Sequence, residues 1–272
     1  MLFTVVQWRA IHHEFHVVFS LPYITHHNVE PDELHIIHIG TSMYLLGSVL
    51  WLLVPKLLPR RPDQNLNTVW EMVARFYNEN GTTSQFTSLC LTMFHDPTKP
   101  KANYPKLKGR GAEVKGLVPA LRHVWERCHN NSDETHAMVL RALNHQCEIQ
   151  STIDEYSGDL FFPPEVATSF RATVDRFLSA YSWLGHAADN NGELLWSMVP
   201  KFHWLWHLAF RSQYLHPRRG ACLLDEDFVG KIKRIVQNTT ASKQLHLIPA
   251  ATLEKWRWGK HIMNTHKVVG RF

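Results

Sequence analysis

Apolar residues recur with helical spacing along most of the chain. The stretch 34–54 is almost continuously apolar and stops before Pro55, and 67–80 is 3.6-periodic. The same pattern predicts further helices over 84–94, 112–129, 134–157, 166–190, 193–214, 225–238 and 249–265. Weak alternation over 15–21 predicts one short strand. The predicted fold class is therefore all-α, with that single strand near the N-terminus.

Breaks in the pattern divide the chain into four segments. Residues 1–33 read as irregular, and 34–94 as a helical subdomain around a buried apolar helix, with a linker at 58–65. A basic loop rich in Pro and Gly occupies 95–111, and 112–272 reads as a helical domain with a basic C-terminal quarter. Pro119 and Pro200 interrupt helical segments of this last domain.

The apolar segment 36–54 has about the ~20 residues that a membrane span requires. It includes His38, Ser42, Ser48 and two glycines, and no other segment resembles it. A buried core helix is the favoured interpretation, and a membrane-anchored protein is the alternative. The first residues lack the basic and cleavage-site features of a signal peptide, and the four cysteines form no CxxC pair. We therefore expect a nuclear or cytoplasmic protein that is not secreted and has no membrane partner.

Charge is distributed unevenly along the chain. The net charge is +5, yet residues 199–272 hold 13 Lys and Arg against 4 Asp and Glu, leaving 16 against 20 in the remainder. A basic quarter of this kind predicts a polyanionic partner, although a solvated basic tail has the same composition. The candidate nucleic-acid contacts are Lys106, Lys108, Arg110, Lys115, Arg218, Arg219, Lys231, Lys233 and Arg234.

Two acids stand out by their position at predicted helix starts. Asp32 in "PDELHIIHIG" precedes the apolar helix, where it serves either as a cap or as a metal-binding acid. Glu226 in "LLDEDFVGKIKRIVQN" opens a helix whose later turns carry cations. This arrangement complements the helix dipole, and it also suits metal-assisted phosphoryl transfer on DNA.

Histidines and tryptophans give two weaker signals. His203 and His207 in "KFHWLWHL" are four residues apart, a spacing that suits two ligands of one metal, so a metal hydrolase is an alternative function. A packed aromatic helix is the favoured interpretation of that segment. Trp256 and Trp258 alternate with Arg257 in "EKWRWGKHI", where anchoring of the last helix is favoured over stacking on bases.

The order of these motifs resembles the C-terminal part of cut-and-paste transposases of the CACTA type. "PDELHIIHIG" is similar to the D-x-x-H-x(4)-G segment that carries their second catalytic aspartate. "VPKFHWLWHLAFRSQYLHPRR" followed by "LLDEDFVGKIKRIVQN" resembles the end of their helical domain and the helix that opens with a glutamate. The whole chain also resembles uncharacterised repeat-rich algal proteins that share the "LKGRGAEVKGL" loop.

The resemblance implies two-metal DNA strand transfer, with Asp32 and Glu226 as two of three Mg²⁺-binding acids. It also implies that the chain is part of a ribonuclease-H-like core with its helical insertion. Only Glu14 and Glu30 are acidic upstream of Asp32, so the first acid of the triad has no counterpart here. We therefore expect a transposase-derived, DNA-binding protein whose metal site is incomplete and which is inactive alone. It would act as a homo-oligomer or with a missing N-terminal catalytic part. A non-enzymatic helical interaction module is the alternative.

Overall fold

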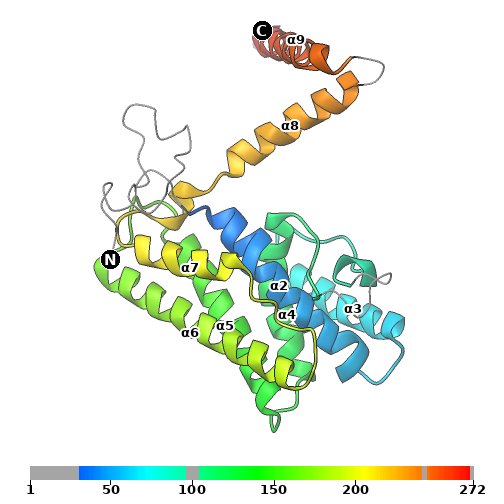
Figure 1. Ribbon diagram of the computed structural model, residues 1–272, viewed down its shortest axis with the longest axis vertical. Coiled ribbons are helices and arrows are strands. Elements are labelled where there is room, and N and C mark those ends of the chain that lie inside the picture. Colours follow the sequence, from blue (N-terminus) through cyan, green and yellow to red (C-terminus); the bar gives the residue numbers. More distant parts are fainter. Residues whose placement is uncertain (1–30, 96–103, 241–243, 270–272) are drawn as a thin grey trace. The chain divides into compact units, whose positions relative to one another are not determined.

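The computed structural model describes residues 31–95, 104–240 and 244–269, and this part of the chain is helical without a strand (Figure 1). The prediction of an all-α fold is confirmed, and the strand expected at 15–21 lies outside the described residues. The long helices are α2 (Ser42–Leu52), α3 (Pro62–Asn80), α4 (Gly111–Cys128), α5 (Glu134–Glu155), α6 (Pro164–Asn190), α7 (Pro200–Arg211), α8 (Leu223–Thr240) and α9 (Ile248–Val269). Shorter turns are η3 (Leu34–Thr41), η4 (Leu53–Leu57), η5 (Leu91–Met93), η6 (Pro217–Gly220) and η7 (Leu245–Leu247).

The chain divides into two compact units. The first ends at Ala221 and the second runs from Cys222 to Phe272. The division therefore falls inside 112–272, which the sequence pattern groups as one domain. It coincides with a change in net charge, which is zero before Cys222 and positive after it.

The core of the first unit is built around the apolar run from η3 through α2 to η4. Ile37, Leu45, Leu46, Leu50 and Leu53 are fully buried there. Leu34–Leu57 is long and apolar enough to cross a membrane by length and composition, and 78% of its most apolar window is buried inside the fold. The prediction that this segment is buried is therefore confirmed.

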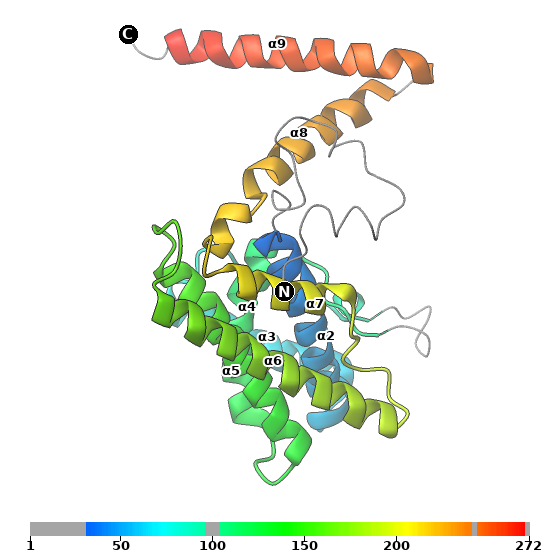
Figure 2. The same cartoon turned by 60° about the vertical axis from the view of Figure 1, so that its left-hand side comes forward.

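The other helices of the first unit surround this run. Helices α5 and α6 lie side by side, α7 packs against both α6 and η3, and α4 contacts α2, α3 and α5 (Figures 1 and 2). Aromatic side chains fill the contact between α6 and α7, where the ring centroids of Tyr181 and Phe202 are 4.1 Å apart. The amphipathic pattern of each helix thus places its apolar face against a neighbour.

The predicted helix at 84–94 is wrong, since only the turn η5 forms there. The segment crosses α4 at Gly116, where a Cβ would come within 2.5 Å of the Ser84 carbonyl oxygen. Phe86, Leu89 and Phe94 are buried from this irregular backbone. Helical spacing of apolar residues was misleading because tertiary packing determines the backbone conformation here.

The predicted linker at 58–65 is wrong in its second half, because α3 already begins at Pro62. Proline is favoured in the first helical turn, where its missing N–H is not needed. The first helix in turn continues past Pro55 to Leu57 as a π-type turn. The expected helix at 193–214 begins only at Pro200 and ends at Arg211.

The second unit contains α8 and α9. Its apolar groove is lined by Ile232 and Val236 of α8 and by Ile248, Thr252 and Trp256 of α9, among others. The Lys255 ammonium of α9 donates to the Asn238 carbonyl of α8 over 2.9 Å. The apolar stripe of α8 thus faces α9, which leaves its charged positions for solvent.

Candidate nucleic-acid interface

Asp32 acts as a cap at the start of η3. Its Oδ1 accepts the Leu34 N–H over 3.0 Å, and its Oδ2 pairs with Nδ1 of His35. The Asp32 carbonyl also accepts the Ile36 N–H over 3.0 Å, which begins the helical pattern. Both carboxylate oxygens are therefore engaged within the first turn of the helix.

A buried pair of titratable groups follows Asp32. Oε1 of Glu33 lies 3.1 Å from Nε2 of His38, and both side chains are nearly inaccessible to solvent. Glu33 Oε2 and His38 Nδ1 have no hydrogen-bond partner within the described part of the chain. The motif "PDELHIIHIG" thus contains two acid–histidine pairs that differ in burial. Asp32 and His35 are partly exposed, whereas Glu33 and His38 are buried.

The helix is broken at Ile39 and Gly40, where the backbone leaves helical geometry. The Lys201 ammonium of α7 donates to the freed Ile39 carbonyl over 3.0 Å. A Cβ on Gly40 would lie 2.5 Å from the His35 carbonyl oxygen, so the break requires glycine. Burial lowers the pKa of Lys201, Lys106 lowers it further, and Asp32 acts in the opposite direction.

The basic loop is fixed by its backbone to α2 and η5. The Leu107 N–H donates to the Met43 carbonyl over 2.9 Å, and the Lys108 N–H to the Met93 carbonyl over 2.7 Å. The side chains of Lys106, Lys108 and Arg110 are exposed. The ammonium of Lys106 lies 5.1 Å from the centre of the Tyr44 ring. A rigid backbone therefore presents these three cations to solvent.

Lys115 and Arg218, far apart in sequence, meet at one carboxylate. The Lys115 ammonium and the Arg218 guanidinium both reach Oδ1 of Asp154, the latter over 3.3 Å. Arg219 donates instead to two backbone carbonyls, those of Gly158 and Asp159. Asp154 was not singled out in the sequence, because no local pattern links it to either cation.

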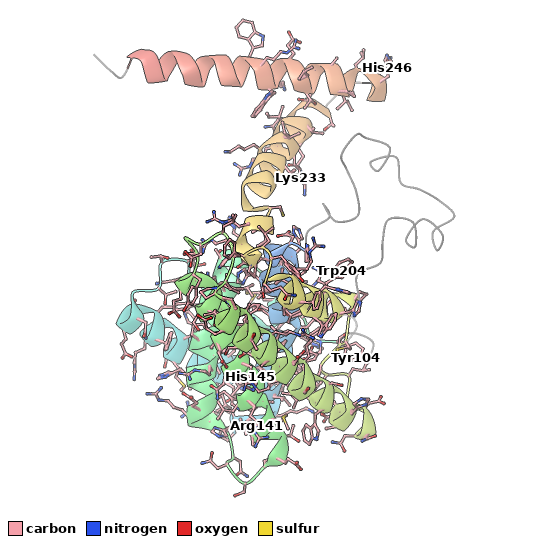
Figure 3. The ribbon with its side chains drawn as sticks, turned by 90° about the vertical axis from the view of Figure 1, so that its left-hand side faces the viewer. Tyr104, Arg141, His145, Trp204, Lys233 and His246 are labelled. Atoms are coloured by element: carbon pink, nitrogen blue, oxygen red, sulfur yellow. The ribbon has the colours of Figure 1, made fainter. Side chains whose placement is uncertain are left out.

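In the second unit the side chains of Lys231, Lys233 and Arg234 are exposed on α8, and Figure 3 labels Lys233. The other catalytic candidate, Glu226, opens the same helix, but its side chain is not among those that the structure describes. Asp32 belongs to the first unit and Glu226 to the second. Around Asp32 the described residues supply one partly exposed carboxylate, and each of its oxygens already has one contact.

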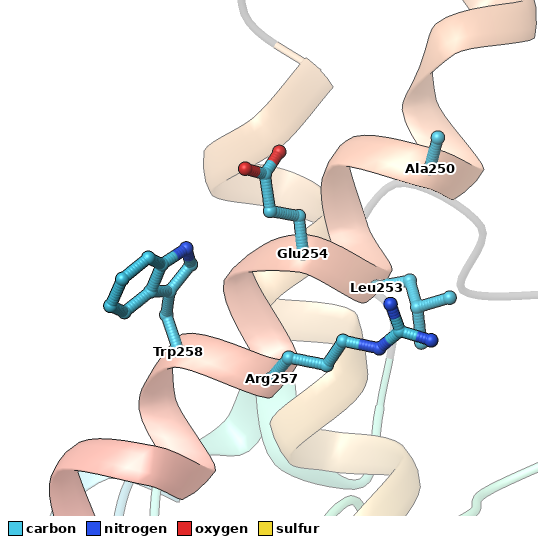
Figure 4. A pocket seen from close by; sticks show the side chains of 5 residues that line it. All are labelled: Ala250, Leu253, Glu254, Arg257 and Trp258. Atoms are coloured by element: carbon cyan, nitrogen blue, oxygen red, sulfur yellow. The ribbon is translucent and has the colours of Figure 1, made fainter.

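Helix α9 carries mixed side chains near "EKWRWG". Figure 4 shows the five residues that line one pocket on this helix, with Glu254 and Trp258 in one row and Leu253 and Arg257 in the neighbouring row. Trp258 is 61% exposed, so it does not anchor α9 as expected from the sequence. Trp256 is more buried and lines the apolar groove shared with α8.

His203 and His207 face one another on α7. Their Nε2 atoms are 2.9 Å apart and the rings are perpendicular. Burial lowers the pKa of His207, and His203 and then Arg211 lower it further. Among the described residues, no third histidine, cysteine or acid joins them in a possible metal-ligand cluster. The pair alone falls short of the three protein ligands that catalytic zinc sites use.

No family model matches the chain, and neither the characterised proteins nor the solved structures give a match.

Proposed function

We propose that this chain is a transposase-derived, DNA-binding protein whose second unit supplies the main electrostatic contact. The observation that carries the proposal is the location of the net charge. Residues 1–221 hold 20 Lys and Arg and 20 Asp and Glu, whereas 222–272 hold 9 against 4. The entire net charge of +5 thus belongs to the second unit, and a localised excess of this kind attracts polyanions.

The exposed cations of α8 support this proposal. Lys233 and Arg234 are exposed, and no ion pair joins either of them to another of the described residues. By contrast, Arg122 and Arg176 of the first unit pair with Glu126 and Glu148. Unpaired lysines and arginines release counterions when they neutralise phosphates, which is the main source of sequence-independent affinity for DNA.

The basic loop of the first unit provides a second set of contacts in this proposal. Lys106, Lys108 and Arg110 follow one another along a backbone held by hydrogen bonds to Met43 and Met93. Cations on a fixed backbone lose less conformational freedom on binding than cations on a mobile tail. The loop is therefore suited to orient DNA that the second unit attracts.

The proposal includes no catalysis by this chain alone. Asp32 is engaged as a helix cap and contacts His35, and the carboxylate of the adjacent Glu33 is buried against His38. In this account the acid of the transposase-like motif has a structural role here, and strand transfer would require acids from another chain or segment.

The test is duplex DNA binding by the full chain, measured by fluorescence anisotropy. A Lys231→Gln, Lys233→Gln and Arg234→Gln triple variant should bind at least tenfold more weakly than the wild type. An Arg122→Gln and Arg176→Gln variant removes two paired cations and should bind nearly normally. Equal weakening by both variants, or by neither, would contradict the proposed role of α8 and favour a helical interaction module.

A further inference from the structure

A pocket of about 430 Å³ lies in the first unit, outside the residues discussed so far. It is formed by the segment before α6, the first turns of α6 and the end of α7. Its walls include Phe161, Phe162, Thr168, Arg171, Phe210 and Gln213. Its volume lies within the range of about 300–1,000 Å³ that is usual for small-ligand sites.

Arg171 is the cation of this pocket, and it has no acidic partner among the described residues. Its guanidinium lies 5.3 Å from the Phe210 ring centre and 5.7 Å from that of Trp206. Those two rings are themselves stacked, with centroids 5.7 Å apart. Arg176, on the same helix, instead pairs with Glu148 at 3.7 Å. Arg171 is thus positioned by aromatic rings and retains its capacity to bind an anion.

Phe161 is held toward solvent by a fixed loop. Its neighbour Phe162 is buried, with its ring centre 4.6 Å from that of His216. The His216 N–H donates to the Leu160 carbonyl over 2.8 Å, and Arg219 donates to the Gly158 carbonyl over 2.8 Å. Because the backbone is anchored on the inner side, Phe161 remains 57% exposed at the pocket wall.

The pocket also offers polar groups for the edge of a planar ring. Nε2 of Gln213 donates to the Phe210 carbonyl over 2.9 Å, which leaves its amide oxygen and second N–H available. The Thr168 hydroxyl donates to the Pro164 carbonyl over 2.8 Å and keeps its acceptor capacity. The anchoring Arg219 adds positive charge beside the loop, whereas its neighbour Arg218 pairs with Asp154.

We propose that this pocket binds one base of single-stranded DNA. The base stacks on Phe161, its edge meets Gln213, and Arg171 takes an adjoining phosphate. Aromatic side chains next to cations are the usual platform for single-stranded nucleic acid. This inference rests on the proposed function of DNA binding, but it assigns the single-strand contact to the first unit and leaves duplex attraction to the second.

The test uses the full chain and fluorescein-labelled oligo(dT) of about 12 nucleotides. Phe161→Ala should weaken binding on the order of 5- to 150-fold, the loss expected for one stacked base, and Arg171→Gln should weaken it in the same direction. Leu160→Ala and Arg176→Gln are matched controls, because Leu160 is 60% exposed beside Phe161 and Arg176 is already paired. Both controls should bind as the wild type does.

Affinity for duplex DNA, measured on the same variants, distinguishes the single-strand site of the pocket from the proposed duplex contact of the second unit. If Phe161→Ala reduces oligo(dT) affinity while duplex affinity is retained, the pocket is a single-strand site. If the wild type binds no duplex but oligo(dT) binding depends on Phe161, the inference holds and the proposed role of the second unit fails. The pocket assignment is overturned if Phe161→Ala binds oligo(dT) as Leu160→Ala does. It is also overturned if poly-glutamate competes more strongly than unlabelled oligo(dT) does, since an acidic peptide would then be the better ligand.

Discussion

Gly47 of α2 lies directly against the backbone of Lys106. A Cβ at position 47 would come within 2.7 Å of both the Cα and the N of Lys106. The backbone of the basic loop can therefore pack against α2 only because residue 47 has no side chain. The position of the cations of the loop depends on that contact. In the sequence, Gly47 is only one of the two glycines that interrupt the apolar segment 36–54.

Gly47→Ala should lower the free energy of unfolding by about 1–3 kcal/mol, because the added methyl group overpacks a backbone contact. It should also weaken DNA binding by displacing Lys106 and Lys108. Gly185→Ala in α6 is the control, since its Cβ would meet only the Trp196 carbonyl oxygen at an ordinary 3.5 Å. That variant should gain about 0.5–1 kcal/mol from helix propensity. Urea unfolding measures the stability of both variants. Equal effects of Gly47→Ala and Gly185→Ala would contradict the proposed contact between Gly47 and the loop.

Asp32→Ala should destabilise the fold by about 1 kcal/mol through loss of the cap on Leu34. Asp32→Asn retains an oxygen that can accept the Leu34 N–H, so it should lose less. Thermal unfolding with and without millimolar Mg²⁺ distinguishes a cap from a metal ligand. A rise in Tm with Mg²⁺ in the wild type that disappears in Asp32→Asn would show that the carboxylate holds a metal.

The side chain of Asn65 stabilises the connection between η4 and α3 by hydrogen bonds to its backbone. Its buried amide donates to the carbonyls of Val54 and Leu58 over 2.8 and 3.0 Å, and its oxygen accepts the Arg60 N–H over 3.1 Å. Asn65→Leu should cost about 2–3 kcal/mol, because it leaves buried backbone groups without partners. Asn67→Leu, two residues along at an exposed position, should change stability by less than about 0.5 kcal/mol. Comparable losses in both variants by urea unfolding would refute this role.

His216 makes stability depend on pH. It is fully buried, and burial lowers the pKa of its imidazole from 6.5, with Glu33 opposing and Arg219 and Arg218 reinforcing that shift. The unfolded chain therefore binds the proton more readily than the folded chain does. The stability that His216 contributes is complete above about pH 6.5 and is lost as the pH falls below it.

His216→Asn should consequently cost stability at pH 7.5, and this cost should shrink at pH 5. The exposed His186→Asn serves as the control and should change stability by less than about 0.5 kcal/mol. Chemical denaturation at several pH values provides the measurement. A His216→Asn penalty that is larger at low pH would mean that the imidazole is stabilised in its protonated form, and a constant penalty would mean that folding does not shift its pKa; either result would contradict this account.

The fold was largely predictable because most helices carry a regular apolar stripe. The 84–94 segment was mispredicted because its apolar residues reach the core from a backbone that crosses α4 at Gly116. The distribution of charge along the sequence indicated the cations of the loop and of α8 as candidate contacts. The same distribution did not predict the contact of Asp154 with Lys115 and Arg218, because this contact joins residues from three distant segments.

The pocket beside Arg171 was not predicted for a similar reason. Its walls come from α6, from α7 and from the loop between α5 and α6, and no local pattern indicates that these distant segments meet. The histidine spacing of α7 did predict a shared face, and His203 and His207 do meet there.

The central claim is that the charge excess of the second unit binds DNA. The most direct test is the slope of log K against log salt concentration for duplex DNA, in the wild type and in the α8 triple variant. Each phosphate contact contributes about −0.9 to this slope, so loss of three contacts should make it shallower by about 2.7. The account predicts that difference. A wild-type slope near zero, or identical slopes in the two proteins, would contradict it.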